Sequence, residues 1–177
     1  DWLKVPTRTG VGQYHSLRFM GNQENWNYML SLSYEDVKGV MKESERKNFN
    51  GTMQLGYRKD KWNIRQSLSV GFNRNQDSPY GRFSDYVQMN RYWEPYDESG
   101  KPVDYFYHPS ASYGPIDNPL YDHAVGVWNK SKYMNLRSNT AIDFAINQNL
   151  KAQATFGLNF KNTRYDGFTP PEHKNFE

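Results

Sequence analysis

Apolar and polar side chains alternate along six stretches of this chain. In the stretch 26–37, the even positions from Trp26 to Tyr34 are aromatic or aliphatic, and the odd positions between them are mostly polar. Successive side chains of a β-strand point to opposite faces, so a period of two predicts strands with one apolar and one polar face. The pattern predicts six such strands, over residues 11–20, 26–37, 47–58, 62–74, 132–145 and 150–163.

The connections between the predicted strands alternate between short and long. The short turns are 21–25, 59–61 and 146–149, and the long links are 38–46, 75–131 and the segment from 164 onward. Because every second link is short, an up-and-down antiparallel sheet places all short turns at one end. Outer-membrane barrels have short periplasmic turns and long extracellular loops. The stretch 75–131 is then one long extracellular loop.

Aromatic residues lie near both ends of the predicted strands. Trp26 and Trp62 each follow a short turn, whereas Tyr34 and Phe72 lie at the opposite ends. The strand from Trp26 to Tyr34 covers roughly 26 Å, and a tilt of about 40° gives an apolar band on the order of 20 Å tall, similar to an outer-membrane belt. We therefore predict an all-β fold of antiparallel up-and-down strands that form part of a transmembrane β-barrel. The alternative is a soluble sheet whose apolar face lies on a sandwich core.

Composition narrows the function classes. The chain has 177 residues, a mean hydropathy of −0.99, 16% aromatic residues, a net charge of +3 and no cysteine. The weak net charge gives no reason to expect a nucleic-acid partner, and the lack of cysteine excludes a disulfide framework. No run of 18 apolar residues is present, which excludes a membrane helix. No signal peptide opens the chain, so we expect an internal segment of a longer protein.

The pattern also suggests specific cross-strand neighbours. A five-residue turn at 21–25 places Leu17 opposite Tyr28. A turn at 146–149 lets Asp143 and Lys151 face each other on the polar side, which is the lumen side in the barrel interpretation.

Two sets of residues are candidates for binding. Aromatic side chains in the long loop can stack on sugar faces, hold a peptide or pack on a lid protein, or they can pack on each other to order the loop. This set consists of Tyr80, Tyr86, Trp93, Tyr96, Tyr105, Tyr107, Tyr113 and Tyr121. The cations expected to face the lumen are Arg65, Arg137, Lys151 and Lys161. They can contact a polar ligand, or they can belong to a solvated wall with structural ion pairs.

The sequence contains none of the metal-binding or catalytic motifs that we considered. The four histidines lack HxH or HExxH spacing, and no GxSxG motif occurs, so we expect no metal site, no cofactor and no catalytic site.

Several motifs resemble the early barrel of the SusC/RagA family of TonB-linked outer-membrane transporters. They are His15-Ser16-Leu17 leading to Gly21, Asn27-Tyr28, Ser31-Leu32-Ser33-Tyr34, Gly39-Val40, Ser44, Arg46, Asn48-Phe49 and the loop sequence SPYGRFSDYVQMNRYWEPYDESGK followed by YFYHPSASYGPIDNPLYD. One departure is Met20-Gly21, where the family often has paired glycines. The resemblance extends over nearly the whole chain but only a minority of a full-length member.

The resemblance carries several implications. A full-length member has a periplasmic plug domain, which this chain lacks, and a barrel of about 22 strands. The resemblance implies TonB-dependent import of nutrient oligomers, either glycans or peptides, across the outer membrane of a Gram-negative bacterium. The implied partners are the TonB complex, a SusD-like surface lipoprotein, the oligomer itself and outer-membrane lipid. The rival interpretations are a soluble all-β carbohydrate-binding module and a passive porin-like channel.

Overall fold

The computed structural model describes residues 1–107, 114–171 and 173–176, and its main element is one six-stranded antiparallel sheet. Its strands are β1 (Val11–Gln23), β2 (Trp26–Lys38), β3 (Glu45–Lys59), β4 (Trp62–Gln76), β7 (Trp128–Ala145) and β8 (Lys151–Phe168). The remaining elements are α1 (Phe83–Val87), β5 (Tyr105–Phe106), β6 (Ile116–Asp117), α2 (Tyr121–Val125) and η1 (Lys174–Phe176). No helix in the described ranges is long and apolar enough to cross a membrane.

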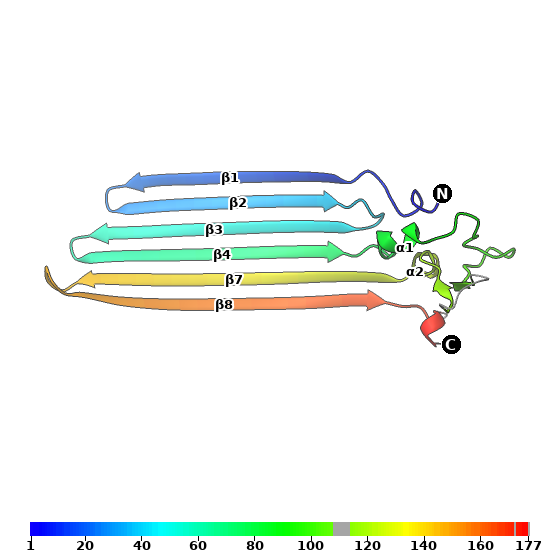
Figure 1. The fold of residues 1–177 in the computed structure, drawn as a ribbon. Coiled ribbons are helices and arrows are strands. Elements are labelled where there is room, and N and C mark those ends of the chain that lie inside the picture. The colour runs from blue at the N-terminus through cyan, green and yellow to red at the C-terminus, as the bar shows by residue number, and fades with distance from the viewer. Residues whose placement is uncertain (108–113, 172, 177) are drawn as a thin grey trace.

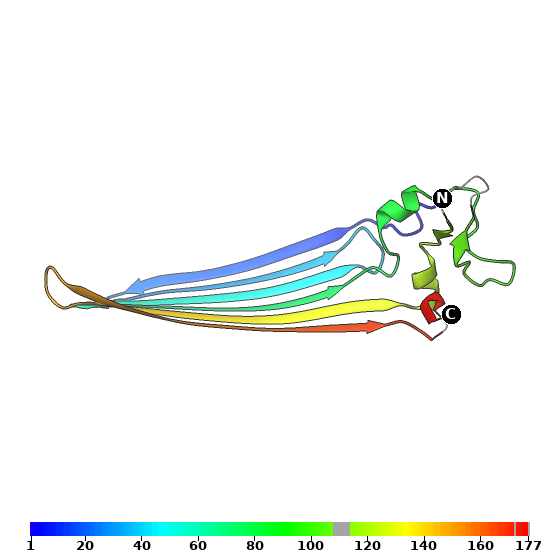
Figure 2. The ribbon, with the colours of Figure 1, turned by 60° about the horizontal axis from the view of Figure 1, so that its bottom comes forward.

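The sheet has the up-and-down topology that the sequence predicts. Its strands follow in the order β1-β2-β3-β4-β7-β8, so each strand pairs with its neighbour along the chain, and β5 and β6 form a separate small sheet. All three short turns lie at one end of the sheet, and the long connections and both termini lie at the other (Figure 1). Turned about its long axis, the sheet is seen to be twisted and bowed along the strands (Figure 2).

The register keeps the apolar positions of all six strands in phase. One row across the sheet joins directly opposed residues from β1 to β8: Leu17, Leu32, Gly51, Val70, Leu136 and Phe160. The neighbouring row, on the other face, joins Arg18, Ser31, Thr52, Ser69, Arg137 and Asn159. The sheet therefore has one apolar face and one polar face over its whole width.

No other part of the described chain covers the apolar face. Leu17 is 60% exposed, Trp26 52% and Phe156 68%. The buried hydrophobic residues lie outside the six-stranded sheet, in the terminal segment and the long connection: Trp2, Tyr80, Tyr86, Phe106, Leu120 and Tyr121. The described residues thus form a single-layer sheet with a small core beyond its loop end, and they do not form a sandwich.

The strands are longer than the alternation indicates. β7 begins at Trp128 instead of 132, and β8 begins at Lys151 instead of 150 and continues to Phe168 instead of 163. The long connection is correspondingly shorter, from 77 to 127. Backbone pairing continues beyond the apolar band, where most side chains on both faces are polar and the period of two disappears, although Trp128 and Phe168 stack at the far end. Alternation therefore marks the apolar band and not the full hydrogen-bonded ladder.

Two predicted cross-strand neighbours are wrong. Leu17 lies opposite Leu32, not Tyr28, because the β1–β2 turn has only two residues, the first of which, Glu24, has a φ of 50°. Asp143 lies opposite Gln153 instead of Lys151. The β7–β8 loop is held by a hydrogen bond from the Ile146 amide to the Leu150 carbonyl (3.0 Å). Both shifts are by an even number of residues, so neither moves a side chain to the other face.

Cysteine cross-linking tests the first register, since the chain has no native cysteine. Ser16 lies directly opposite Ser33, so Ser16→Cys/Ser33→Cys is expected to form a disulfide on mild oxidation of the intact protein. The matched pair Ser16→Cys/Met29→Cys fits the register predicted from the five-residue turn, but in the structure it is separated by roughly 13 Å along the strand. Peptide mass spectrometry after oxidation distinguishes the two, and efficient cross-linking of the second pair alone would contradict the structure.

Candidate functional site

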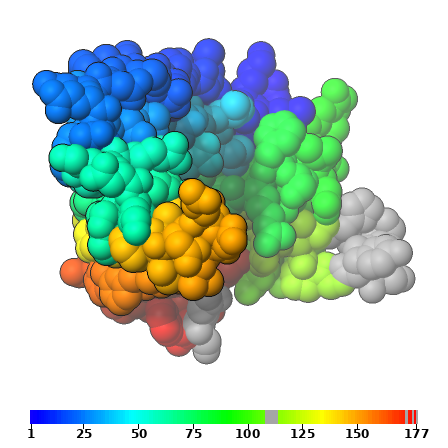
Figure 3. Space-filling model, turned by 90° about the vertical axis from the view of Figure 1, so that its left-hand side faces the viewer, coloured from blue at the N-terminus to red at the C-terminus, as the bar shows by residue number. Residues whose placement is uncertain are grey.

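Two regions carry the candidate binding residues: the polar face of the sheet, and a loop cap that comprises residues 1–10 and the described part of 77–127. Viewed along the strands from the short-turn end, the loop cap lies to one side of the sheet (Figure 3).

Aromatic packing joins distant segments of the loop cap. The Trp2 indole N–H donates to the Asn90 carbonyl (3.0 Å), and its ring contacts Phe106 edge-on at a centroid distance of 5.7 Å. The Trp93 ring stacks on Phe106 at a centroid distance of 5.0 Å. Such pairs each add about 0.5–1.5 kcal/mol beyond the area that they bury. The rings therefore give this connection an ordered core of its own.

Tyr86 is the most deeply buried ring of the loop cap. It is 1% exposed, and its hydroxyl lies 2.8 Å from the Tyr80 carbonyl and 3.0 Å from the Pro119 carbonyl. Burial raises the pKa of the Tyr86 phenol well above its usual value, because the anion would lose its hydration. The hydroxyl therefore remains a hydrogen-bond donor at every physiological pH, and it ties α1 to the segment before α2.

Tyr80 links the loop cap to the β2–β3 connection. Its hydroxyl lies 2.8 Å from Nε2 of His123, and Nδ1 of the same imidazole lies 3.5 Å from a Glu43 carboxylate oxygen. Burial, and then the negative charge of Glu43, raise the pKa of Tyr80. This chain of three side chains fixes α2 relative to the neighbouring link. These contacts between Tyr80, His123 and Glu43 therefore support the structure of the loop cap.

The eight loop aromatics fall into two groups by exposure. Tyr80, Tyr86 and Tyr121 are buried, and Trp93 packs partly buried against the core. Tyr96 is 41% exposed, Tyr105 37% and Tyr107 75%, whereas Tyr113 lies outside the described residues. In this conformation the first group orders the cap, and the accessible rings are Tyr96, Tyr105 and Tyr107. A role of any of them in ligand contact stays a prediction.

Sequence reasoning did not select Tyr92, which is 75% exposed. The Arg91 guanidinium donates to the Tyr92 hydroxyl (2.7 Å) and lies over its ring at 4.8 Å. An exposed ring with a fixed cation beside it suits a polar or anionic group that also has a flat surface. The adjacent Arg-Tyr pair in the sequence was the available signal.

All four predicted lumen cations occur on the polar face. Arg65 donates to the Asp143 carboxylate (3.0 Å), and Lys161 lies 5.5 Å from the Tyr133 ring centroid. Arg137 and Lys151 are exposed, and within the described ranges neither has an ion pair. The polar face also has a groove of about 430 Å³ near the short turns, lined by Asn27, Gln54, Leu55, Gly56, Arg65, Gln66, Ser67, Asn139 and Ala141. This surface suits hydrogen bonding to a polar solute.

The described residues offer little for metal chemistry. Within 1–107, 114–171 and 173–176, no group of three or more His, Cys, Asp or Glu side chains is placed to hold a metal ion. Asp97 accepts hydrogen bonds from Ser99 and from the Lys101 amide, which lower its pKa. Residues 97–101 therefore form a turn that is held by the Asp97 carboxylate.

Long antiparallel strands with one apolar and one polar face, short turns at one end and loops at the other are consistent with part of a β-barrel wall. Among solved structures, the chain is similar to the RagAB peptide transporter, with a TM-score of 0.67 and 23% identity over 94% of this chain and 19% of that chain. It is also similar to the RagAB peptide importer in the closed-closed state, with a TM-score of 0.73 and 23% identity over 97% of this chain and 20% of that chain. For the open-open state the TM-score is 0.71 and the identity 22%, over 94% of this chain and 19% of that chain.

The fold predicted from the sequence motifs is thus confirmed, and these neighbours are transporters instead of enzymes. The chain spans about a fifth of the length of the RagAB chains that it matches. No family model and no curated protein matches the sequence.

The order of the loop cap can be tested through Tyr86. Tyr86→Phe removes the buried donor and leaves two carbonyl oxygens without it, which is expected to destabilise the cap by about 1–3 kcal/mol. Hydrogen–deuterium exchange of the intact protein should become faster in 77–127 and stay unchanged in β4 and β7. The control Tyr107→Phe alters an exposed hydroxyl and should change neither region. Equal exchange in both variants would show that the Tyr86 contacts do not order the cap.

Proposed function

We propose that this chain is a segment of the barrel wall of an outer-membrane transporter. Its apolar face contacts lipid, its polar face lines the solute path, and its loop cap lies on the extracellular side. The observation that supports this most directly is the apolar face itself, which is in register across six strands and uncovered by any described residue. An apolar surface of this extent suits hydrocarbon better than water.

Aromatic pairs bound the apolar band at both ends, as expected for membrane interfaces. Near the short turns, Trp26 and Tyr57 lie 4.7 Å apart and Trp62 and Phe144 4.5 Å apart, measured between ring centroids. Near the loop end, Phe49 and Phe72 lie 6.3 Å apart. Rings with an apolar body are favoured at the level of the headgroups, where the band meets water.

Polar side chains within the band satisfy each other. Gln66 on β4 donates to the Ser138 hydroxyl (2.9 Å) and accepts from the Thr140 hydroxyl, and all three lie on the apolar face. A polar group in hydrocarbon that lacks a partner costs several kcal/mol. The mutual hydrogen bonds remove that cost, which supports an apolar surrounding for this face.

The proposed solute is a nutrient oligomer, imported with energy from the TonB complex and captured with a SusD-like surface lipoprotein. The sequence resemblance supports the energy source and the lipoprotein. The description of the similar structures as a peptide transporter or importer favours an oligopeptide over a glycan. The plug and the TonB-contacting segment belong to parts of the protein outside this chain.

A charge on either face tests the lipid assignment. Leu68 lies near the middle of the apolar band, and Leu68→Arg is expected to destabilise the membrane-inserted protein by about 2–4 kcal/mol. The matched variant Ser67→Arg places the same charge on the polar face and should cost little. Urea unfolding of the intact protein from bilayers measures both. A protein that is soluble without detergent would support a soluble carbohydrate-binding module, and equal costs for the two variants would contradict an apolar surrounding for the face that carries Leu68.

Uptake by cells tests the transport assignment. Labelled oligopeptides should accumulate in a manner that depends on TonB, whereas a passive porin would admit them without it. Tyr92→Ala/Tyr107→Ala should raise the half-saturating concentration by about tenfold or more if these rings stack on the solute, and Tyr92→Phe/Tyr107→Phe should retain wild-type uptake. Unchanged uptake in the alanine variant would show that these rings do not bind the peptide.

A further inference from the structure

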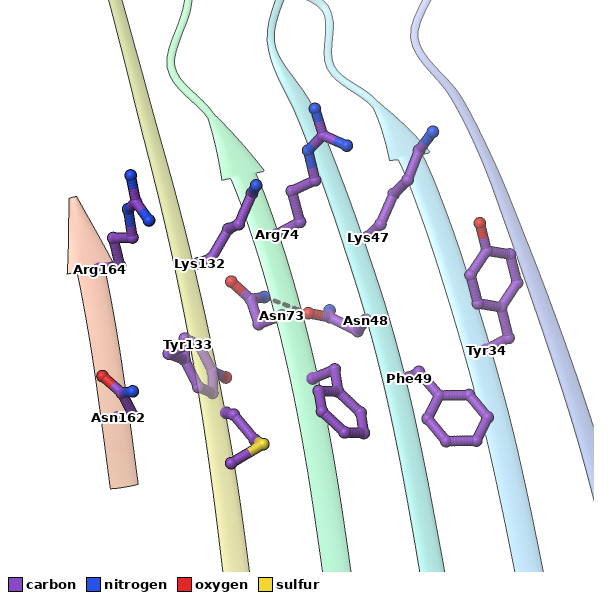
Figure 4. Close-up of a pocket in the computed structure, with 12 residues that line it drawn as sticks. Tyr34, Lys47, Asn48, Phe49, Asn73, Arg74, Lys132, Tyr133, Asn162 and Arg164 are labelled. Atoms are coloured by element: carbon purple, nitrogen blue, oxygen red, sulfur yellow. Dashed lines mark hydrogen bonds between the residues drawn. The ribbon is translucent and has the colours of Figure 1, made fainter. Parts of the chain in front are cut away.

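Four basic side chains cross the apolar face in a single row at the loop end of the sheet. Lys47 of β3 lies opposite Arg74 of β4, Arg74 opposite Lys132 of β7, and Lys132 opposite Arg164 of β8. All four point toward the loop end from adjacent strands (Figure 4). This set of Lys47, Arg74, Lys132 and Arg164 is called the basic row below.

The basic row concentrates positive charge that the protein only partly neutralises. Like charges directly opposite each other in a sheet are unfavourable. At one end of the row, Lys47 lies 3.8 Å from an Asp36 oxygen, and at the other, Arg164 lies 3.0 Å from an Asp166 oxygen. The two central cations, Arg74 and Lys132, have no ion pair with any described residue. The centre of the row therefore favours an external anion.

An apolar surface lies directly beneath the charges. The next row toward the middle of the sheet contains Tyr34, Phe49, Phe72 and Met134, and on β8 the polar Asn162. This row and the basic row line one groove of about 410 Å³. Figure 4 shows Tyr34 and Phe49 on the side of the basic side chains that faces away from the loops. Cations above aromatic and aliphatic side chains match a molecule with an anionic head and an apolar tail.

The other end of the apolar face lacks such a row. The corresponding positions beside the short turns are Lys59, Trp62, Phe144 and Ala152, with a single cation among them. The charge asymmetry thus distinguishes the two ends of the sheet. If the loop end faces outward, as in the proposed function on which this inference rests, the basic row lies at the headgroups of the outer leaflet.

We propose that the basic row binds the phosphate groups of the anionic glycolipid of the outer leaflet. Arg74 and Lys132 contact the phosphates, and the acyl chains lie along Phe72, Met134 and the apolar rows below. The bound lipid neutralises the row and fixes the depth of the barrel wall in the membrane.

Native mass spectrometry of the intact, detergent-purified protein tests this with bisphosphorylated lipid A as the probe. Each cation near an anionic lipid surface contributes roughly a fivefold gain in affinity. Arg74→Gln/Lys132→Gln is therefore expected to lose about 25-fold in lipid A binding, and removal of both phosphates from the probe should weaken wild-type binding similarly. The control Lys59→Gln/Lys61→Gln removes the same charge at the short-turn end and should lose about twofold or less.

The outcomes distinguish a failure of the lipid site from a failure of the proposed function. Equal losses in the two variants, or retained binding by the first, would overturn the basic row as a site, even if fractionation finds the wild-type protein in the outer membrane. A wild-type protein that is soluble without detergent would overturn the proposed function and the lipid site together. A salt titration of the wild type avoids any folding defect of the variants. Raising the ionic strength should release lipid A, and salt-independent binding would contradict the inference.

Discussion

The register of the hairpins is the constraint on which the rest of the structure depends. A shift of one residue in any pairing would transfer the apolar side chains of that strand to the polar face. In the β1–β2 and β3–β4 hairpins the two-residue turns prevent such a shift, with Glu24 and Asp60 in the left-handed region at φ of 50° and 52°. On the apolar face, Gly21 leaves room for the ring of Tyr28, since a Cβ there would overlap the end of the Tyr28 side chain. Turn geometry and side-chain size thus support the same alignment.

The sequence was sufficient to predict the six strands, because each strand has one face toward water and one apolar face, and this produces the alternation. It was insufficient for their ends, because the ladder continues through polar residues such as Lys130 and Arg164, where no period remains. It was also insufficient for the register of the first hairpin. The glycine and the two asparagines in 21–25 are compatible with a five-residue turn. The shorter turn is evident only in the backbone, where Gln23 pairs with Trp26 and Glu24 has a positive φ.

The loop cap shows a different limit of sequence reasoning. Tyr86 and Tyr107 occur in the same aromatic-rich stretch, yet one is 1% and the other 75% exposed. The difference arises from long-range contacts, such as that between Trp2 and Phe106, which have no local signal. The sequence therefore identified the loop as aromatic, and it left open whether the rings order the loop or contact a ligand. The division between rings that hold the cap together and rings that can meet a solute, Tyr92 included, needed the fold.

The side chains of the apolar face change in character from its middle to its loop end, and this explains why the alternation pattern did not identify its basic residues as a site. Near its middle, the polar Gln66 is satisfied by Ser138 and Thr140. At its loop end, the positions of the same parity carry Arg74 and Lys132 without partners among the described residues. When residues are sorted only as apolar or polar, a cation at a position that faces the apolar side is interpreted as the end of the predicted strand. On a surface that passes from hydrocarbon to headgroup, the same cation is expected where the lipid becomes anionic. A sandwich core would bury these positions or leave them in water, and neither surrounding calls for four aligned charges above an aromatic row.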